Sequence, residues 1–169
     1  IGDIVTEIYG YQTARKFIWL GLIFELIFAI LITLVIQLPF SSELASQPYH
    51  QEVFGHTIRF VLSSIVGDIA SSFANIYLMS KSKIMFKGRR FIARSIASTI
   101  AGQLILNVII CFLAFYDVSN FAVTMKITLS GYLLEVLYAI LFSYPAFFII
   151  LILKRVEGRD AYDVGINYN

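Results

Sequence analysis

Four long hydrophobic runs, separated by short polar stretches, set the pattern of this chain. They cover residues 17–38, 53–79, 91–115 and 129–153. An α-helix rises about 1.5 Å per residue, so each run is long enough to cross the roughly 30 Å hydrocarbon core of a membrane. The pattern predicts an all-α fold, a polytopic integral membrane helix bundle with four complete transmembrane helices, in a single domain over residues 1–169.

Composition supports this class and excludes several others. Of the 169 residues, 59% are hydrophobic and 14% are charged, against about 25% charged residues in an average soluble domain. The only cysteine, Cys111, lies inside the third run, which excludes a disulfide framework and a thiolate metal cluster. The formal net charge of +2 gives no reason to expect nucleic acid. We therefore expect a lipid bilayer as the surroundings, with no metal, no cofactor and no nucleic-acid partner.

Basic residues gather in alternate connections between the runs. Residues 17–58 contain no lysine or arginine, and the connection between the third and fourth runs contains only Lys126. Apart from Arg59 and Arg94, which lie inside runs, the others lie before the first run, between the second and third runs, and at the end of the chain: Arg15, Lys16, Lys81, Lys83, Lys87, Arg89, Arg90, Lys154, Arg155 and Arg159. Because cytoplasmic loops carry an excess of Lys and Arg, both chain ends and the 80–90 loop, with its turn at Gly88, are expected to be cytoplasmic.

The first ten residues, IGDIVTEIYG, do not have the features of an amino terminus. They contain no initiator Met and no signal-peptide charge or hydrophobic region. We expect them to be the cytoplasmic end of a helix that starts earlier. Asp3 and Glu7 stand one helical turn apart in this stretch, so they share one face of that helix.

Each hydrophobic run also carries polar or ionisable residues on one face. An ionisable side chain at the middle of a span costs about 3 kcal/mol or more, so such residues usually face the bundle interior. In the second run, for example, Ser64, Ser71 and Asn75 recur at helical spacing around Asp68. The residues expected to line one shared cavity are Glu25, Asp68, Asn75, Gln103, Asn107 and Glu135.

A structural role is the alternative for each of these residues. Polar side chains between membrane helices often only hold the helices together, at about 0.6 kcal/mol each. The carboxylates of the spans can form structural ion pairs with Arg59 or Arg94, and Arg94 can instead extend to the membrane surface. Tyr9 belongs either to an interfacial aromatic belt or to a site where it stacks on a bound ring.

The opening stretch GDIVTEIYGYQTARKFIWLG resembles the signature of the queuosine precursor transporter family, also called the vitamin uptake transporter group. In that family an Asp, a Glu or similar group, an aromatic-Gly pair and an Ala-Arg pair lie at the end of the second membrane helix. The later runs are similar to the following family helices, through VFGHTIRFVLSSIVGDIASSFANIY, ARSIASTIAGQLILNVIICFLAF and LEVLYAILFSYPAFFIILILKR. The resemblance covers nearly the whole chain. It implies about six membrane-spanning helices, of which the first and most of the second would precede Ile1.

The resemblance implies a transporter that takes up a queuosine precursor (7-cyano- or 7-aminomethyl-7-deazaguanine) or a related purine-like base across the bacterial inner membrane. A carboxylate accepts the ring N–H and the exocyclic amine of a guanine-like edge as a bidentate pair, and Asn or Gln amides read the neighbouring atoms. The residues expected to bind this substrate are Asp3, Glu7, Tyr9, Glu25, Asp68, Asn75, Gln103, Asn107 and Glu135. The candidates for structural ion pairs are Arg15, Arg59 and Arg94. Pairing of Asp3 or Glu7 with Arg15 or Arg94, which would fix the helix end, is the alternative to substrate binding.

The chain departs from the family pattern at two positions. Asn75 stands where an Asp is expected late in the second run, and Leu106, next to Asn107, stands where the third run often has an Asp. These differences leave the identity of the substrate open more than the fold.

Other functions fit the sequence less well. An enzyme would need a catalytic constellation, but the sequence shows no Ser-His-Asp grouping and no metal motif, so we expect no enzyme. The alternative is a substrate-binding subunit like the S-component of an energy-coupling vitamin transporter. Partner subunits would then hydrolyse ATP, because this chain has no phosphate-binding Gly-rich loop of its own. A purely structural or assembly protein is disfavoured by the acids in the spans. The driving force, an energy-coupling partner and a homo-oligomeric state stay open.

Overall fold

The computed structural model describes residues 2–37, 57–114 and 120–165. These residues form five α-helices: α1 (Gly2–Tyr9), α2 (Tyr11–Gln37), α4 (Thr57–Met85), α5 (Phe91–Leu113) and α6 (Phe121–Glu157). Of these, α2, α4, α5 and α6 are long and apolar enough to cross a membrane. The predicted all-α bundle with four membrane spans is confirmed.

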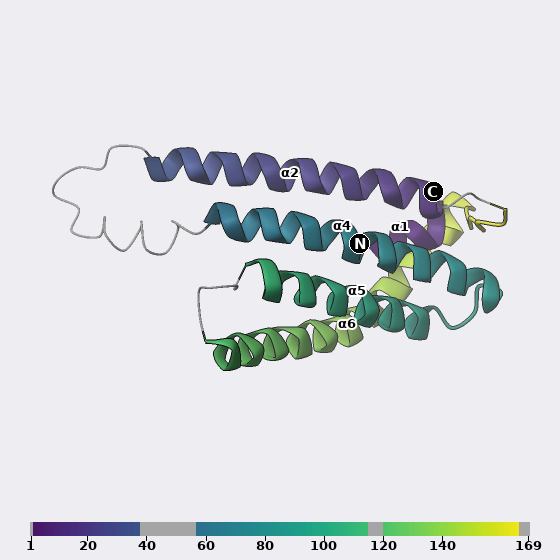
Figure 1. Ribbon diagram of the computed structural model, residues 1–169. Coiled ribbons are helices and arrows are strands. Elements are labelled where there is room, and N and C mark those ends of the chain that lie inside the picture. Colours follow the sequence, from purple (N-terminus) through teal and green to yellow (C-terminus); the bar gives the residue numbers. More distant parts are fainter. Residues whose placement is uncertain (1, 38–56, 115–119, 166–169) are drawn as a thin grey trace.

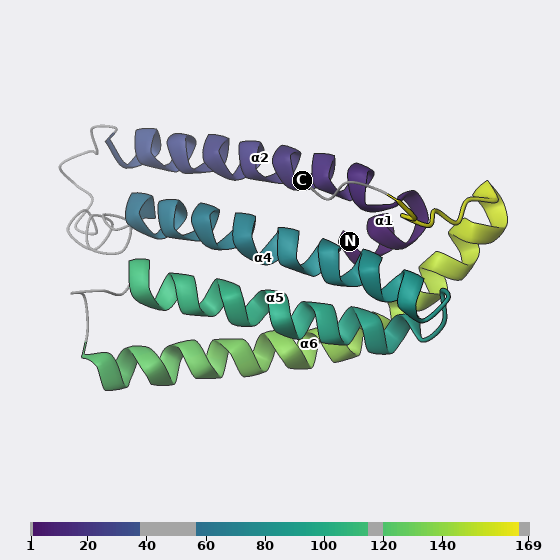
Figure 2. The same cartoon turned by 45° about the vertical axis from the view of Figure 1, so that its right-hand side comes forward.

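The four long helices lie side by side in chain order, with α2 beside α4, α4 beside α5, and α5 beside α6 (Figure 1, Figure 2). The contact between α4 and α5 is the most extensive. The short α1 packs against α2, α4 and α6 at one end of the bundle, where the last turns of α6 also lie. Lys83, Arg94 and Lys154 meet at this end, which we call the basic end.

The observed helix boundaries differ from the predicted runs mainly in α6. This helix begins at Phe121 rather than at residue 129 and ends at Glu157 rather than at 153. The Asn120 side chain accepts a hydrogen bond from the Ala122 backbone N–H at 3.0 Å and so caps the first turn. The placement of Lys126 in a loop is therefore wrong, because a single lysine does not interrupt a helix that is capped ahead of it.

The other three spans agree with their predicted runs over most of their length. α2 begins at Tyr11 rather than at residue 17, and α4 ends at Met85 rather than at 79, because the polar residues beside each run continue the helix. The turn predicted at Gly88 joins α4 to α5. The predicted outer connection after residue 38 and the predicted ends at 53 and 115 lie outside the described residues.

Two glycines shape the backbone near the site. Gly10 separates α1 from α2 with a φ of 83°, the left-handed conformation that ends many helices. Gly102 lies where α5 crosses α4, and a Cβ atom there would lie 3.1 Å from the Ser71 backbone oxygen. The absence of a side chain at Gly102 therefore lets the two helices approach closely, as small residues commonly do between membrane helices.

Buried side chains gather at the basic end. Ile8 and Met79 are completely buried there and pack with Phe91 and Ile150. Elsewhere α2 and α6 expose many large apolar side chains, among them Phe24, Phe28, Leu134 and Phe142. Exposed apolar helix faces of this kind suit contact with lipid. The buried polar groups that a binding site needs are therefore found mainly at the basic end and along α4 and α5.

Candidate substrate site and ionic cluster

Glu7 is the most enclosed acid of the described chain, with 1% of its surface exposed. Its Oε2 accepts a hydrogen bond from Arg94 Nη2 at 3.0 Å, and its Oε1 accepts one from Lys154 Nζ at 3.1 Å. Lys83 Nζ lies 3.6 Å from the same Oε1 and also donates to the Glu7 backbone oxygen. Three cations from α4, α5 and α6 therefore converge on one acid of α1.

Asp160, just after α6, completes this ionic cluster, which consists of Glu7, Lys83, Arg94, Lys154 and Asp160. Lys154 Nζ lies 2.9 Å from Asp160 Oδ1, and Lys83 Nζ donates to the same oxygen. Partial burial raises the pKa of Asp160, but the hydrogen bonds and positive charges of Lys154 and Lys83 outweigh it and hold the pKa below its ordinary value. The ionic cluster thus ties the segment after α6 to α1, α4 and α5.

Asp163 holds the same segment against the break between α1 and α2. Its Oδ2 accepts hydrogen bonds from the Tyr11 backbone N–H at 2.9 Å and from Ser80 Oγ at 2.6 Å. The Ala161 backbone N–H also donates to the Ile8 backbone oxygen, at 3.1 Å. A buried carboxylate at the first turn of α2 satisfies an N–H that the helix itself leaves unpaired.

A second polar group, which we call the acceptor group, consists of Asp3, Asn75 and Ser95. Asp3 Oδ1 accepts a hydrogen bond from Asn75 Nδ2 at 3.0 Å, and its Oδ2 accepts one from the Ser95 hydroxyl. The Asn75 Oδ1 atom and, further along α5, the Gln103 Oε1 atom are buried and have no hydrogen-bond partner among the described residues. Buried polar atoms are normally paired, so these two oxygens stand out as unused acceptors.

The other acids predicted to line the site lie apart from the acceptor group. Glu135 on α6 accepts a hydrogen bond from Asn107 on α5 at 2.6 Å, and Asp68 accepts one from Ser64 on its own helix at 3.0 Å. Glu25 is partly buried on α2. The structure therefore distributes the predicted residues over several polar groups along the bundle, whereas the sequence predicted one cavity.

Tyr9 points toward the surface of the basic end. Its hydroxyl donates to the Glu157 carboxylate, whose two oxygens lie 2.8 and 2.7 Å away. The hydrogen bond with Glu157 is the main cause that raises the pKa of Tyr9. Tyr9 therefore lies beside an acidic side chain and outside the acceptor group.

The three arginines proposed as ion-pair candidates have different surroundings. Arg94 pairs with Glu7 in the bundle interior, the arrangement that the sequence left as the alternative to substrate binding. Arg59 Nε donates to the Leu113 backbone oxygen at 3.2 Å, and the Arg15 guanidinium carbon lies 5.8 Å from the centre of the Phe73 ring. Arg94 thus joins helices α1 and α5 instead of extending to the membrane surface.

Sequence reasoning missed four members of this end of the molecule: Lys83, Lys154, Asp160 and Asp163. The two lysines were read only as topology markers, and the two acids follow the last hydrophobic run. The signal that could have identified them is the mixture of acidic and basic residues in 154–163. A cytoplasmic tail whose positive charge served only to orient the protein in the membrane would need no acidic residues.

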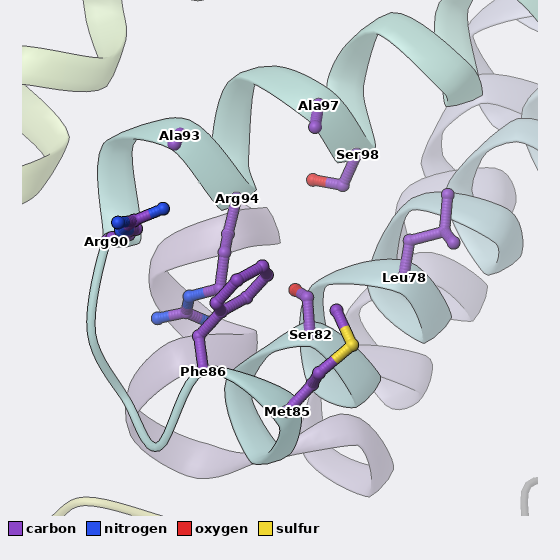
Figure 3. A pocket seen from close by; sticks show the side chains of 9 residues that line it. All are labelled: Leu78, Ser82, Met85, Phe86, Arg90, Ala93, Arg94, Ala97 and Ser98. Carbon is purple, nitrogen blue, oxygen red and sulfur yellow. The ribbon is translucent and has the colours of Figure 1, made fainter.

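A cavity of about 360 Å³ opens between the end of α4 and the start of α5 (Figure 3). Figure 3 shows the Ser82 and Ser98 hydroxyls together with the side chains of Met85 and Phe86 around it. Arg94 is the one predicted site residue in its lining. Within the described ranges no three His, Cys, Asp or Glu side chains are grouped so as to hold a metal ion.

Comparison with known proteins identifies the family. The family described as "Putative vitamin uptake transporter" matches residues 1–150. A protein of Bacillus subtilis (strain 168) named "Probable queuosine precursor transporter" is 30% identical over 141 residues, which cover 79% of this chain and 58% of that relative. The chain therefore spans little more than half the length of the relative. No solved structure matches. The family match and the four apolar spans show that this chain is a multi-pass membrane protein and belongs to the family described as "Putative vitamin uptake transporter".

Proposed function

We propose that this protein takes up a queuosine precursor, 7-cyano- or 7-aminomethyl-7-deazaguanine or a related purine-like base, across the bacterial inner membrane. The name of the Bacillus subtilis relative supports this substrate class. The observation that carries the proposal is the acceptor group, in which the Asp3 carboxylate lies beside a buried amide oxygen of Asn75 that has no partner among the described residues.

An acceptor-rich site suits a ligand rich in hydrogen-bond donors. The guanine-like edge of the base carries a ring N–H next to an exocyclic amine, and one carboxylate can accept from both. Asn75 Oδ1 and Gln103 Oε1 offer further acceptors. A buried polar atom without a partner costs about 1–3 kcal/mol, and a donor on the ligand would recover that cost. In the bound state, the base replaces the Asn75 and Ser95 donors on Asp3.

The helix that carries Asp3 is interrupted at Gly10, two turns beyond Asp3. Transporters commonly bind their substrates beside discontinuous membrane helices, where backbone groups and half-helix ends face the cavity. Glu7 follows Asp3 by one turn of α1 toward the basic end, so the ionic cluster closes the bundle between the acceptor group and that end. With the basic end in the cytoplasm, the cytoplasmic exit is closed by ion pairs and opens when they separate.

The orientation can be tested by cysteine labelling in a Cys111→Ser background of the full-length protein. We expect Lys87→Cys, in the exposed α4–α5 turn, to react only from the cytoplasm. Ser46→Cys, which lies outside the described residues, should react only from outside. The positive-inside distribution of charge is the physical reason. Reaction of both cysteines from one side, or the reverse pattern, contradicts the orientation.

Substrate binding by the acceptor group is tested by Asp3→Asn in the full-length protein. The substitution keeps the shape but replaces one acceptor oxygen by a donor, so a donor of the base meets another donor. A loss of about 1–3 kcal/mol corresponds to an affinity roughly 5- to 150-fold lower. Uptake of labelled base by a bacterium that depends on external queuosine precursor should fall accordingly at equal membrane levels of protein.

The matched control is Glu157→Gln, which removes a negative charge from the exposed surface of the same end. We expect this variant to take up the base as the unmodified protein does. Normal uptake by Asp3→Asn at equal expression would remove Asp3 from the binding site. If uptake by the unmodified protein is lost when an ATPase partner is deleted, that result would favour the alternative, an energy-coupled substrate-binding subunit.

A further inference from the structure

We propose that the cavity between α4 and α5 binds an anionic phospholipid, with the lipid phosphate at Arg90 and an acyl chain along the cavity. Its volume of about 360 Å³ lies within the range of about 300–1,000 Å³ that is usual for small-molecule sites. The last turns of α4 and the first turns of α5 form its walls (Figure 3). The cavity shares no residue with the acceptor group. The inference therefore holds whichever small molecule the protein carries.

The walls of the cavity are mainly apolar and face away from the bundle interior. Leu78 and Met85 on α4 and Ala93 and Ala97 on α5 line the cavity, and all four side chains are exposed. Residues 78 and 85 are about two helical turns apart and residues 93 and 97 about one turn, so each pair forms a stripe along its helix. The small alanine side chains leave room between the two stripes. A groove of this kind suits an extended hydrocarbon chain.

The position of the groove along the helices places it beside lipid. The apolar span of α4 ends at Met85 and that of α5 begins at Phe91, so Leu78 and Ala97 lie within the spans and the turn at 86–90 lies just beyond them. Exposed side chains of a membrane span contact acyl chains, whereas residues at its end reach the headgroups. A lipid in the groove therefore has its headgroup beside the α4–α5 turn.

The α4–α5 turn supplies the charge that a phosphate needs. Lys87, Arg89 and Arg90 are exposed there, and none of their side chains forms a hydrogen bond or an ion pair with a described residue. Arg90 also lines the cavity, and Figure 3 shows its guanidinium at the end opposite to Leu78. None of the described residues in the lining is acidic. Basic pockets between membrane helices bind anionic headgroups, chiefly on the cytoplasmic side, where the proposed orientation places this turn.

The backbone of the turn gives no reason for its basic residues. Lys87 and Arg90 have φ angles of 51° and 56°, in the left-handed region that residues other than Gly, Asn and Asp rarely adopt. Glycine or asparagine would form the same turn at lower cost, as Gly88 does between them with a φ of 72°. Attraction of an anionic headgroup accounts for arginine at position 90.

Native mass spectrometry of the purified full-length protein tests the site, with phosphatidylglycerol as the anionic probe and phosphatidylcholine as the neutral probe. The unmodified protein should bind phosphatidylglycerol more tightly. Arg90→Asn should weaken phosphatidylglycerol binding about fivefold, the contribution of one basic residue near a membrane surface, and leave phosphatidylcholine binding unchanged. The matched control is Arg155→Asn, which changes an exposed arginine in the last turn of α6, outside the cavity, and should bind both lipids as the unmodified protein does.

A second variant tests the groove separately from the charge. Ala97→Leu fills part of the cavity while Arg90 stays in place, so phosphatidylglycerol binding should fall. The Ala97 side chain is exposed, so the protein should still fold. Inorganic phosphate at the same concentration as the lipid should not displace phosphatidylglycerol, because it has no chain to occupy the groove.

Melting temperatures separate lipid binding from folding. A ligand that binds only the folded state stabilises it, so phosphatidylglycerol should raise the melting temperature of the unmodified protein more than that of Arg90→Asn. Without lipid, Arg90→Asn should melt no lower than the unmodified protein, because asparagine tolerates the left-handed conformation. A lower melting temperature without lipid would give Arg90 a structural role and counts against the proposal.

Four binding results would overturn the proposal. In the first, Arg90→Asn binds phosphatidylglycerol as tightly as the unmodified protein. In the second, Arg155→Asn loses as much binding as Arg90→Asn, so that any surface cation is equivalent. In the third, Ala97→Leu binds the lipid normally, which leaves the groove to a protein segment or a second copy of the chain. In the fourth, inorganic phosphate displaces the lipid, and the site then belongs to a free anion.

Discussion

Replacing Glu7 with Gln is expected to destabilise the protein strongly. The change removes the anion on which Arg94, Lys83 and Lys154 converge. Lys83 and Lys154 keep Asp160, but Arg94, whose side chain is 1% exposed, loses its acidic partner. Breaking a buried ion pair by removing one member costs about 3–5 kcal/mol, because the remaining charge stays buried without compensation. The protein should melt at a lower temperature in detergent and reach the membrane in smaller amounts.

A second substitution should restore much of this loss. In Glu7→Gln with Arg94→Met, neither charge is left alone, and buried pairs replaced by apolar groups are often as stable as the original. Glu25→Gln is the matched control, because Glu25 has no hydrogen bond or ion pair within the described residues, and it should change the melting temperature little. A stable Glu7→Gln variant that loses uptake would instead support substrate contact by Glu7, as the sequence predicted.

The membrane spans could be predicted because their signal is local. Hydrophobic runs longer than a bilayer crossing identify α2, α4, α5 and α6 without knowledge of their neighbours. The start of α6 was placed too late because its signal is a single capping side chain, Asn120, ahead of a helix that also contains Lys126. The shared face of Asp3 and Glu7 was also predictable, because α1 is helical over both.

The partners of these residues could not be predicted, because they depend on packing between helices that are far apart in sequence. Asp3 and Glu7 lie on one face, yet one contacts amide and hydroxyl groups while the other contacts cations. The difference of one helical turn decides whether the side chain meets Asn75 or Arg94. Periodicity assigns a face to a residue, but only the packed bundle assigns its depth and its neighbours.

Removal of the Asp163 carboxylate should release the segment after α6 from the basic end. In Asp163→Ala, the Tyr11 backbone N–H and the Ser80 hydroxyl both lose the hydrogen bond that the buried Asp163 carboxylate accepts. Each of these hydrogen bonds contributes about 0.5–1.5 kcal/mol, so the loss of both costs about 1–3 kcal/mol of local stability. We expect faster hydrogen exchange at Tyr11 and easier proteolysis of residues 158–165, together with a lower melting temperature.

Asp163→Asn separates the hydrogen bonds from the charge. The amide keeps one acceptor oxygen, and both bonds in the structure end on a single oxygen, Oδ2. This variant should therefore lie between Asp163→Ala and the unmodified protein in hydrogen exchange and melting temperature. If Asp163→Asn is as damaging as Asp163→Ala, the negative charge at the first turn of α2 matters more than the two hydrogen bonds, as expected for an acid that interacts with a helix dipole. If neither variant changes exchange at Tyr11, the Asp163 hydrogen bonds do not hold the break at Gly10 in place.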